Sequence, residues 1–382
     1  MAELPAALAA GPIYLDYNAT TPVDPRVAEV MWPHLAHWFG NPGSAHRYAE
    51  EPKRALAEAR GQVADWIGAA PDEVVFTGTG SEADQLAIRG AVLAARSPRP
   101  RVITQATEHP AVLATCEALR RLHGARVTVL PVDGEGVVDP DALSECLDDD
   151  VVLVSVMAAN NETGTLQPVG ELARRSRAAG ALFHCDAAQA AGKIRLDVGA
   201  LGVDLLTLVG HKVYAPKGIA ALYVRDGVAL EPVGYGGGQE RGRRAGTENV
   251  ASAVAFGAAA GIADPERERI TALRDELHER LVAALPGRVR LNGPVAERLP
   301  NTLNVSIDGV AGHALLAAVP GVAASTGSAC HSGLRTPSPV LTAMGLSRER
   351  ALGALRLSLG RWSTPQDVRA AADLLVEAVT TL

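Results

Sequence analysis

The chain has 382 residues, of which 47% are hydrophobic and 4% aromatic, and its formal net charge is −7. This length predicts a large core divided between two domains, and the composition is that of an ordinary soluble globular protein. The acidic balance argues against nucleic-acid binding over the whole surface. We therefore expect no direct nucleic-acid partner.

The N-terminal residues do not resemble an export signal. Glu3 stands where a signal peptide needs a basic residue, and Pro5 and Pro12 interrupt the apolar run. The most apolar later stretch, residues 250–263, is too short to span a bilayer and fits a buried helix. These features predict a cytoplasmic protein without membrane contact.

Seven short apolar runs alternate with helical patterns between about residues 70 and 225. Runs such as VVLVSVM are apolar on both faces, which is typical of parallel strands covered by helices on each side. The intervening residues 81–96 and 109–124 repeat apolar side chains every three or four positions, as helices do. The alternation predicts a mostly parallel α/β sheet with strands at 73–78, 101–106, 126–132, 151–157, 181–186, 204–210 and 220–225.

The pattern changes after about residue 257. A long charged helix is expected over 265–285, then short strands over 289–293, 302–307 and 321–326, and only helices from there to the end. We expect a large domain over 16–257 and a small α+β domain over 258–382. Residues 1–15 are expected to pack on the small domain.

The four cysteines show no CxxC spacing and no histidine at zinc-finger spacing, so neither a metal site nor a disulfide framework is expected. Cys116, Cys146 and Cys185 lie in helical or strand patterns, where a buried and inert thiol is the favoured interpretation. Cys330 differs because it lies in ASTGSACHSG, residues 324–333, among the smallest side chains of the chain.

Two segments in the sheet region have polar residues at strand ends. In FTGTGSEADQLAIRG (76–90) a Gly-rich turn enters a helix, and its N–H groups with Thr79 and Ser81 can hold a phosphate, although such turns often have no ligand. In FHCDAAQAAGK (183–193) Asp186 follows an apolar strand, with Gln189 three residues on. Asp186 is placed either for a ligand or for a helix N-cap.

A third segment, LTLVGHKVYAPKG (206–218), has Lys212 in a turn bounded by Gly and Pro. Partial burial there lowers the pKa of a lysine and suits imine formation with a carbonyl, whereas the alternative is a surface lysine in a loop. A phosphate turn, a carboxylate for a ring nitrogen, a lysine for an aldehyde and His109 in TEHPAV together match one cofactor. That cofactor is pyridoxal 5'-phosphate (PLP).

Over nearly its whole length the chain resembles the class V aminotransferase superfamily, specifically its group I cysteine desulfurases and selenocysteine lyases. The resemblance rests on ordered motifs, namely YLDYNATTPVDPRV, GNPGSAHRYAEE, NNETGTLQPV, HCDAAQAAGK, GHKVYAPKGIAALYVR, GGGQERGRRAGTENV, TGSACHSG and LRLSLGR. It implies a type I PLP-enzyme fold with a seven-stranded mostly parallel sheet, a small C-terminal α+β domain and a homodimer. It also implies L-cysteine as the substrate and a sulfur-acceptor protein as a partner.

The resemblance implies a role for each matching residue. Lys212 would form the imine with PLP and move the substrate α-proton, Asp186 would pair with the ring nitrogen, and Gln189 would bond the phenolic oxygen. His109 would stack on the ring and assist proton transfer. The remaining matches are the phosphate ligands Gly80, Ser81 and His211, the cross-subunit phosphate ligand Thr247, and the substrate-carboxylate ligands Asn161 and Arg356.

The same resemblance gives Cys330 the central role. In desulfurases the cysteine of this motif attacks the substrate sulfur, which leaves alanine and a persulfide on the enzyme. A Gly- and Ser-rich loop suits a residue that collects sulfur inside the site and delivers it outside. The thiolate is the expected nucleophile.

Three positions depart from the usual desulfurase pattern. Val209 replaces a serine that helps to bind phosphate, which Thr207 cannot be assumed to replace, and Thr79 stands where glycine is usual. His331, directly after Cys330, resembles selenocysteine lyases, so cleavage of selenocysteine remains the alternative. A class V transaminase or decarboxylase would not need Cys330, and a non-enzymatic scaffold would not need Lys212.

Overall fold

The structure is a computed structural model that describes residues 4–95, 97–263, 266–327 and 336–382. Its largest element is a seven-stranded sheet with the order β2-β8-β7-β6-β5-β3-β4. All seven predicted strands are confirmed, and β8 alone runs antiparallel to its two neighbours within this sheet. The strands are β2 (Val74–Thr77), β3 (Arg101–Gln105), β4 (Arg126–Leu130), β5 (Val151–Ser155), β6 (Leu182–Asp186), β7 (Leu205–Val209) and β8 (Ala220–Val224).

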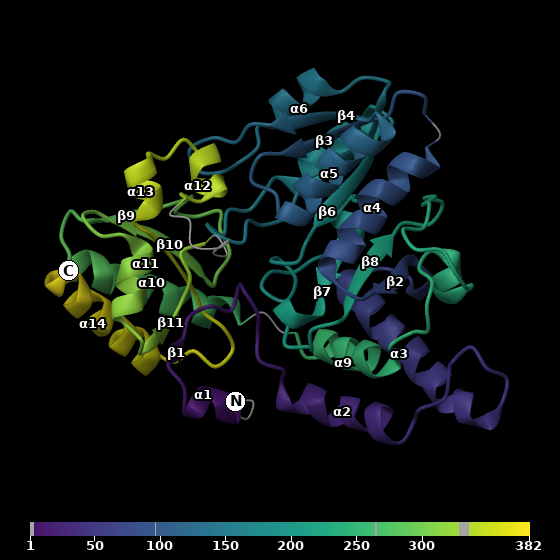
Figure 1. The fold of residues 1–382 in the computed structure, drawn as a ribbon, viewed down its shortest axis with the longest axis horizontal. Helices are drawn as coiled ribbons and strands as arrows, with labels where there is room; N and C mark the ends of the chain where they lie inside the picture. The colour runs from purple at the N-terminus through teal and green to yellow at the C-terminus, as the bar shows by residue number, and fades with distance from the viewer. Residues whose placement is uncertain (1–3, 96, 264–265, 328–335) are drawn as a thin grey trace.

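Helices cover both faces of the large sheet (Figure 1). Because side chains alternate along a strand, Val75 packs on one face while Val74 and Phe76 pack on the other. The Val75 face is covered by α4 (Gly80–Ala94) and α5 (Pro110–His123). The opposite face is covered by α3 (Glu50–Ile67), α7 (Val169–Ala178) and the predicted buried helix α9 (Val250–Gly261), with α2 (Pro25–Ala36) beside α9.

A second core lies around a three-stranded antiparallel sheet with the order β12-β10-β9. The predicted charged helix is α10 (Arg267–Ala284), and it packs with the C-terminal α14 (Pro365–Thr381). Other elements of this part are β9 (Val289–Leu291), β10 (Thr302–Ile307), α11 (Gly312–Ala318), β11 (Val322–Ala323), α12 (Pro339–Ala343) and α13 (Arg348–Leu352). The exact domain boundary at 257 stays a prediction, and α9 runs to Gly261.

The described N-terminal segment contributes to the second core. After the short α1 (Ala6–Ala9), β1 (Ile13–Tyr14) pairs in parallel with β11, and Leu15 is buried in the second core. Figure 1 shows this segment passing between the two parts of the molecule before α2. Residues 16–21 therefore lie at the junction of the two parts.

The expectation of helices alone after residue 326 is wrong. Residues Ala354–Ser358 form β12, which pairs with β10 and is buried along its whole length. Arg356, at the centre of β12, interrupts the apolar pattern of the segment. A charged side chain is unusual in a buried strand, so the sequence did not indicate one here. That arginine instead faces the site described below.

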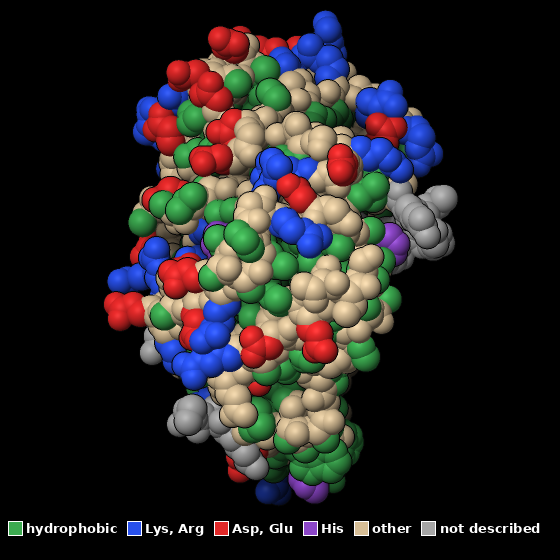
Figure 2. Space-filling model, turned by 90° about the vertical axis from the view of Figure 1, so that its left-hand side faces the viewer, with side chains coloured by type: hydrophobic (Ala, Val, Ile, Leu, Met, Phe, Trp, Pro, Cys, Tyr) green, Lys and Arg blue, Asp and Glu red, His purple; other side chains and the backbone are tan. Residues whose placement is uncertain are grey.

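Surface charge is mixed on the side of the second core. Figure 2 shows acidic and basic side chains interspersed over this face, and ion pairs of this part include Arg280–Glu276 and Arg290–Asp308. Such mixing differs from the basic stripe typical of nucleic-acid-binding surfaces. Within the described residues, no helix combines the length and apolarity needed to cross a membrane.

The cysteine predictions are largely confirmed for the described residues. Cys116 in α5 and Cys185 in β6 are buried, and burial raises the pKa of the Cys116 thiol to about 12. Cys146, at the end of α6 (Pro140–Cys146), is half-buried. Cys330 lies outside the described residues.

Candidate functional site

The site lies at the carboxyl edge of the large sheet. Because β2, β3, β5, β6 and β7 point the same way, the residues that follow them meet at one edge, where open α/β sheets bind ligands. A cavity of about 1230 Å³ opens there, bounded on its other side by residues of the second core. It is lined by nine of the predicted residues, namely Gly80, Ser81, His109, Asn161, Asp186, Gln189, His211, Lys212 and Arg356.

Lys212 ends the short 3₁₀ turn Gly210–Lys212 that follows β7. Its Nζ donates to the backbone oxygens of Asn18 at 2.6 Å and Ala19 at 2.9 Å. Burial, and after it the positive charge of Arg356, lowers the pKa of Lys212 to about 8. The lysine is therefore not an ordinary surface residue, and about a tenth of its amine is neutral and nucleophilic at pH 7, far more than for a lysine in water.

Asp186 ends β6 and is buried at the base of the cavity. Its Oδ1 accepts a hydrogen bond from the backbone N–H of Ala188 at 2.9 Å, and residues 188–193 form turns instead of a helix, so it is not a helix N-cap. Burial raises the pKa of Asp186, against the opposing effects of the Ala188 N–H, His109 and Lys212. A cationic ring nitrogen beside Asp186 would offset that burial and favour the carboxylate.

Two more buried carboxyl groups, Asp84 and Glu108, line the cavity near Asp186. Burial raises the pKa of both groups, followed by repulsion from Asp186, and brings that of Glu108 to about 8. Glu108 Oε1 accepts from the Met157 N–H at 2.6 Å and from Gln105 Nε2 at 3.0 Å. Glu108 Oε2 and Asp84 Oδ1 are buried without a hydrogen-bond partner in the described part of the chain.

His109 is held at the start of α5. As the N-cap residue, its Nδ1 accepts the Ala111 N–H at 3.2 Å, which leaves Nε2 as the ring's other polar atom. Burial lowers the pKa of His109, with Asp186 opposing this effect and Lys212 adding to it. A neutral imidazole in this position can stack on a planar ring and exchange a proton through Nε2.

The predicted phosphate turn is the N-terminus of α4. Thr79 is its N-cap, and Thr79 Oγ1 accepts the Glu82 N–H at 3.1 Å, so the N–H groups of Gly80 and Ser81 remain for an anion. The backbone of Thr79 is extended, with φ −154° and ψ 161°, so threonine fits without strain where glycine is usual. His211, across the turn, bonds Thr20 Oγ1 through Nδ1 at 3.1 Å, and burial lowers the pKa of His211 to about 4.

Val209 packs directly against this turn. A Cβ added to Gly80 would lie 2.6 Å from Val209 Cγ2, so the glycine allows the close approach. The methyl group occupies the place of the expected hydroxyl. Thr207 does not compensate, because its hydroxyl is buried in the sheet and bonds His184 Nε2 at 3.1 Å.

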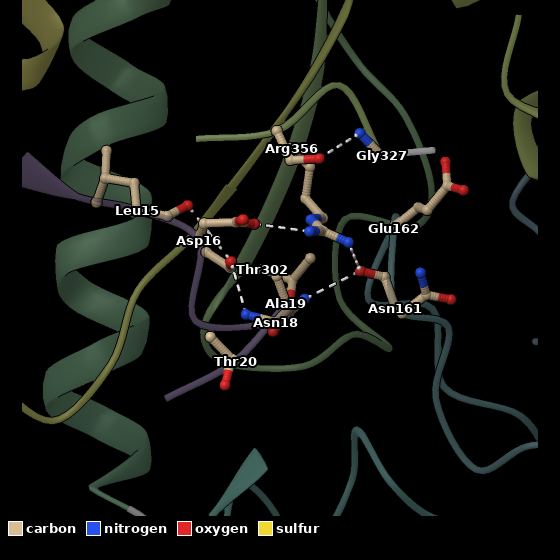
Figure 3. A network of polar contacts seen from close by, with 12 residues as sticks. Leu15, Asp16, Asn18, Ala19, Thr20, Asn161, Glu162, Thr302, Gly327 and Arg356 are labelled. Atoms are coloured by element: carbon tan, nitrogen blue, oxygen red, sulfur yellow. Dashed lines mark hydrogen bonds and ion pairs between the residues drawn. The ribbon is translucent and has the colours of Figure 1, made fainter. Parts of the chain in front are cut away.

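Asn18 connects several site residues through both its main chain and its side chain. Its backbone oxygen accepts from Lys212 and, at 3.0 Å, from Gln189 Nε2. Its Nδ2 donates to the Asn161 oxygen at 3.1 Å and to Thr302 Oγ1 at 2.9 Å, as Figure 3 shows. The residue thus fixes Lys212 and Gln189 relative to the second core.

Arg356 enters the cavity from β12 and is only 5% exposed. One Nη bonds Asp16 Oδ1 at 2.6 Å and the other reaches the Asn161 oxygen at 3.3 Å (Figure 3). Its Nε is buried without a partner among the described residues, so the guanidinium retains donors for a carboxylate. Asn161 lines the cavity beside it.

Sequence reasoning missed several polar residues that line the cavity. Asp16 and Asn18 lie in the quoted motif YLDYNATT, and Glu108 directly precedes His109. Their position in the sequence, next to a predicted site residue or within a quoted motif, was the signal that could have identified them as cavity residues. The missed residues that line the cavity are Asp16, Asn18, Asp84, Glu108, Glu162 and His313.

Two predicted residues are not brought to this cavity by the described chain. Thr247 is exposed and does not line it, as expected of a residue that would act in another subunit, and its role stays a prediction. Cys330 and His331 lie outside the described residues. Residues on both sides of that segment, Gly327 and Thr336 among them, line the cavity.

The residues present fit PLP. The α4 N-terminus offers N–H donors for a phosphate, Lys212 offers an amine for an aldehyde, and Asp186 offers a carboxyl for a ring nitrogen. The orphaned carboxyl atoms of Asp84 and Glu108 keep the base of the cavity polar. In the described ranges, no group of three or more His, Cys, Asp or Glu side chains is arranged to hold a metal ion.

Comparison with known proteins gives one consistent result. The family model "Aminotransferase class-V" matches residues 13–370. A "Cysteine desulfurase" of Trichormus azollae is 46% identical over 97% of this chain and 93% of its own. A "Cysteine desulfurase IscS" of Dictyoglomus turgidum is 43% identical over 97% and 95%. A solved "NIFS-LIKE PROTEIN" is 36% identical, with a TM-score of 0.90 over 97% of this chain and 100% of its own.

Proposed function

The chain belongs to the class V aminotransferase family and is a PLP-dependent cysteine desulfurase, and we propose that it moves the sulfur of L-cysteine onto Cys330 and leaves L-alanine. The observation that carries this proposal is the environment of Lys212. Its amine has a pKa of about 8 and lies in the same cavity as Asp186, His109 and Arg356.

Each residue has a defined task in this proposal. Arg356 and Asn161 bind the carboxylate of L-cysteine. The Nε–H of Arg356 has no hydrogen-bond partner among the described residues and is available as a donor to it. Asp186 pairs with the ring nitrogen of PLP, and Gly80, Ser81 and His211 hold its phosphate. Gln189 donates to the phenolic oxygen, and His109 stacks on the ring.

When bound, PLP supplies an aldehyde for amines and a ring that accepts the electron pair released at the substrate α-carbon. Lys212 Nζ takes the α-proton, a task for which an amine with a pKa near the working pH is suited. Arg356 and Asn161 keep the substrate oriented during this transfer. His109, whose Nδ1 is held by the Ala111 N–H, would assist proton movement through Nε2.

Cys330 completes the reaction as the nucleophile. Its thiolate forms an S–S bond with the substrate sulfur while the substrate Cβ–S bond breaks, so the product is a persulfide. Support for this role comes from the motif TGSACHSG and from the flanking residues, such as Gly327 and Thr336, that line the cavity. A sulfur-acceptor protein would then remove the outer sulfur atom.

We also propose a homodimer in which Thr247 reaches the phosphate of the neighbouring subunit. The exposure of Thr247 is consistent with this, and α2 and the residues after it present a surface that we call the α2 patch. It consists of the exposed large side chains Val30, Trp32, Leu35, Trp38, Phe39 and Tyr48. Large apolar side chains exposed along one segment often mark sites of protein–protein contact. A cytoplasmic location remains a prediction from the sequence.

The selenocysteine lyase alternative rests on His331 and has no support from the relatives named above, which are cysteine desulfurases. A selenol ionises more readily than a thiol, so a lyase would depend less on an activated Cys330. The two activities therefore differ in their response to loss of Cys330.

The test measures alanine formation from L-cysteine and from L-selenocysteine with the parent enzyme, Cys330→Ala and Lys212→Ala. We expect the parent to form alanine from L-cysteine, and Cys330→Ala to form none although PLP is still bound. Lys212→Ala should show neither activity nor lysine-bound PLP absorbance. Cys116→Ala is the matched control, since that thiol is buried in α5 and does not line the cavity. Turnover of L-cysteine at the parent rate by Cys330→Ala would contradict the nucleophile role, and activity confined to selenocysteine would support the lyase.

A further inference from the structure

A second lysine, Lys193, lies half-buried behind the cavity and has no role in the reaction described above. Its Nζ donates to Gln189 Oε1 at 2.6 Å and to Asn18 Oδ1 at 3.0 Å. Both acceptors are neutral amide oxygens, and no carboxylate among the described residues forms an ion pair with this lysine. Withdrawing an ammonium group from water onto neutral acceptors, without a carboxylate, costs free energy, which suggests that its position serves the site.

Lys193 does not touch the substrate cavity. It lines a smaller, separate pocket, where Tyr17 and Tyr214 are also found, and Lys212 borders both spaces. Gly192, with φ +72°, reverses the chain just before Lys193 and so directs its side chain back toward Gln189. Any effect of Lys193 on the reaction must therefore pass through another residue.

Lys193 acts on the site through its hydrogen bond to Gln189. Its Oε1 is held by Lys193, and one N–H of its Nε2 is held by the backbone oxygen of Asn18, so one N–H remains and the side chain lines the cavity. Lysine has no acceptor when charged, so it bonds only the oxygen end of the amide. The contact also polarises the amide, which makes the remaining N–H a stronger donor.

Asn18, in contrast, does not depend on Lys193. Its Oδ1 also accepts from Asn301 Nδ2 at 3.0 Å, and its Nδ2 donates to Asn161 and Thr302. Without Lys193, Asn18 would keep its orientation, whereas Gln189 Oε1 would be buried without a donor. The amide would then keep only its bond to the Asn18 oxygen, and it would move to bring Oε1 to a new donor or to water, because an unsatisfied buried acceptor is costly. Its remaining N–H would no longer be fixed toward the cavity.

We propose that Lys193 is a positioning residue that fixes the Gln189 amide so that its N–H faces the phenolic oxygen of bound PLP. This inference rests on the proposed role of Gln189. The N–H stabilises the ionised phenolic oxygen, and its loss makes that oxygen hold a proton more tightly. Burial, and after it the charges of Lys212 and Arg356, lowers the pKa of Lys193. Both the ammonium and the neutral amine have enough N–H donors for the contacts with Gln189 and Asn18.

The test follows the absorbance of lysine-bound PLP against pH in the purified holoenzyme. In Lys193→Met the protonation midpoint should rise by roughly one pH unit, because a hydrogen bond to a charged group is lost. Gln189→Met should give a similar rise, and adding Lys193→Met to Gln189→Met should give no further change. Lys53→Met, at an exposed lysine of α3, is the matched control and should keep the parent midpoint.

The results distinguish failure of the positioning role of Lys193 from failure of the proposed PLP-dependent function. No shift in Lys193→Met, or an equal extra shift in the Gln189→Met background, would overturn the positioning role. Lys193→Gln, which keeps an N–H donor, should stay closer to the parent, and it decides the matter if Lys193→Met does not fold. A Lys193→Gln midpoint shifted as far as that of Gln189→Met would reject the role. A parent protein that bound no PLP would instead contradict the proposed function.

Discussion

At the residue scale, Lys212 shares its end of the cavity with Arg356, and burial together with that guanidinium lowers the pKa of the lysine to about 8. In the apoenzyme the rate of covalent PLP attachment should therefore rise with pH around a midpoint of about 8, because only the neutral amine attacks an aldehyde. Arg356→Met removes a positive charge and leaves Asp16, which acts to raise this pKa, without its ion-pair partner. The midpoint should move to higher pH, and attachment at neutral pH should slow roughly three- to tenfold.

Stopped-flow absorbance of apoenzyme mixed with PLP measures this rate. Arg195→Met, at an exposed arginine outside the cavity, is the control and should match the parent. An unchanged midpoint in Arg356→Met would mean that burial alone sets the pKa of Lys212.

Glu108 gives a second prediction at the residue scale, on stability. Burial, and after it repulsion from Asp186, raises the pKa of Glu108 from 4.5 to about 8. Between these values the folded protein holds a proton that the unfolded chain lacks, so Glu108 makes the fold less stable as pH rises through this window. Glu108→Gln imitates the protonated acid and removes the penalty. The apoenzyme variant should gain on the parent by a few kcal/mol from about pH 5 to about pH 8.

Urea unfolding of both apoproteins across this range measures the gain. Glu145→Gln, at an exposed position of α6, should give a difference that does not change with pH. A Glu108→Gln difference that was equally flat would show that Glu108 is already ionised in the folded protein.

At the scale of elements, the turn Gln239–Gly242 leads into the segment with Thr247 and is held by a buried ion pair. Glu240 and Arg241 have φ of 46° and 56°, a left-handed conformation that costs free energy in residues other than glycine. The two Glu240 carboxylate oxygens accept hydrogen bonds from the two Nη atoms of Arg60 in α3, at 2.7 and 2.8 Å. Glu240 Oε2 also accepts the Phe76 N–H at 3.1 Å. The arginine also stacks on the Phe76 ring, 4.9 Å from its centroid.

Arg60→Met should therefore lower the free energy of unfolding by about 3 kcal/mol, because a buried carboxylate loses its partner. Arg54→Met is the matched control on the same helix, since Arg54 is exposed and its solvent-screened pairs with Glu51 and Glu58 should contribute little to stability. Chemical unfolding at fixed protein concentration compares the two. Equal losses would mean that the turn does not depend on the buried pair.

At the scale of the whole molecule, the α2 patch and Thr247 connect assembly with cofactor binding. Trp32 is 63% exposed and Phe39 is 77% exposed, so two charges introduced there should prevent burial of this surface against a second subunit. The double variant Trp32→Glu with Phe39→Glu should be monomeric. Because Thr247 of the partner would be absent, it should also bind PLP more weakly than the parent.

Light scattering gives the mass, and equilibrium dialysis gives the PLP affinity. Val295→Glu places a charge at a 79% exposed apolar residue outside the α2 patch, and it should behave as the parent does. A double variant that remained dimeric would place the interface elsewhere.

The fold was predictable from the sequence where local pattern and burial agree. The runs that became β2, β7 and β8 are buried along their whole length, as strands covered by helices on both faces are. The strand β12 was missed because its central arginine breaks the apolar pattern, and only the cavity explains a charge there. Lys212 and Asp186 were found because each follows a buried strand in a turn, a local feature visible in the sequence.

The sequence by itself determined the α/β sheet, the position of the site at its carboxyl edge and the identity of the residues that match PLP chemistry. The tertiary structure alone decided which groups share an environment. The Asn18 contacts join segments far apart in the chain, and the pKa shifts of Lys212 and Glu108 come from burial and from neighbours of this kind. Desolvation and Coulomb interactions depend on distance in space, and no local pattern encodes that distance.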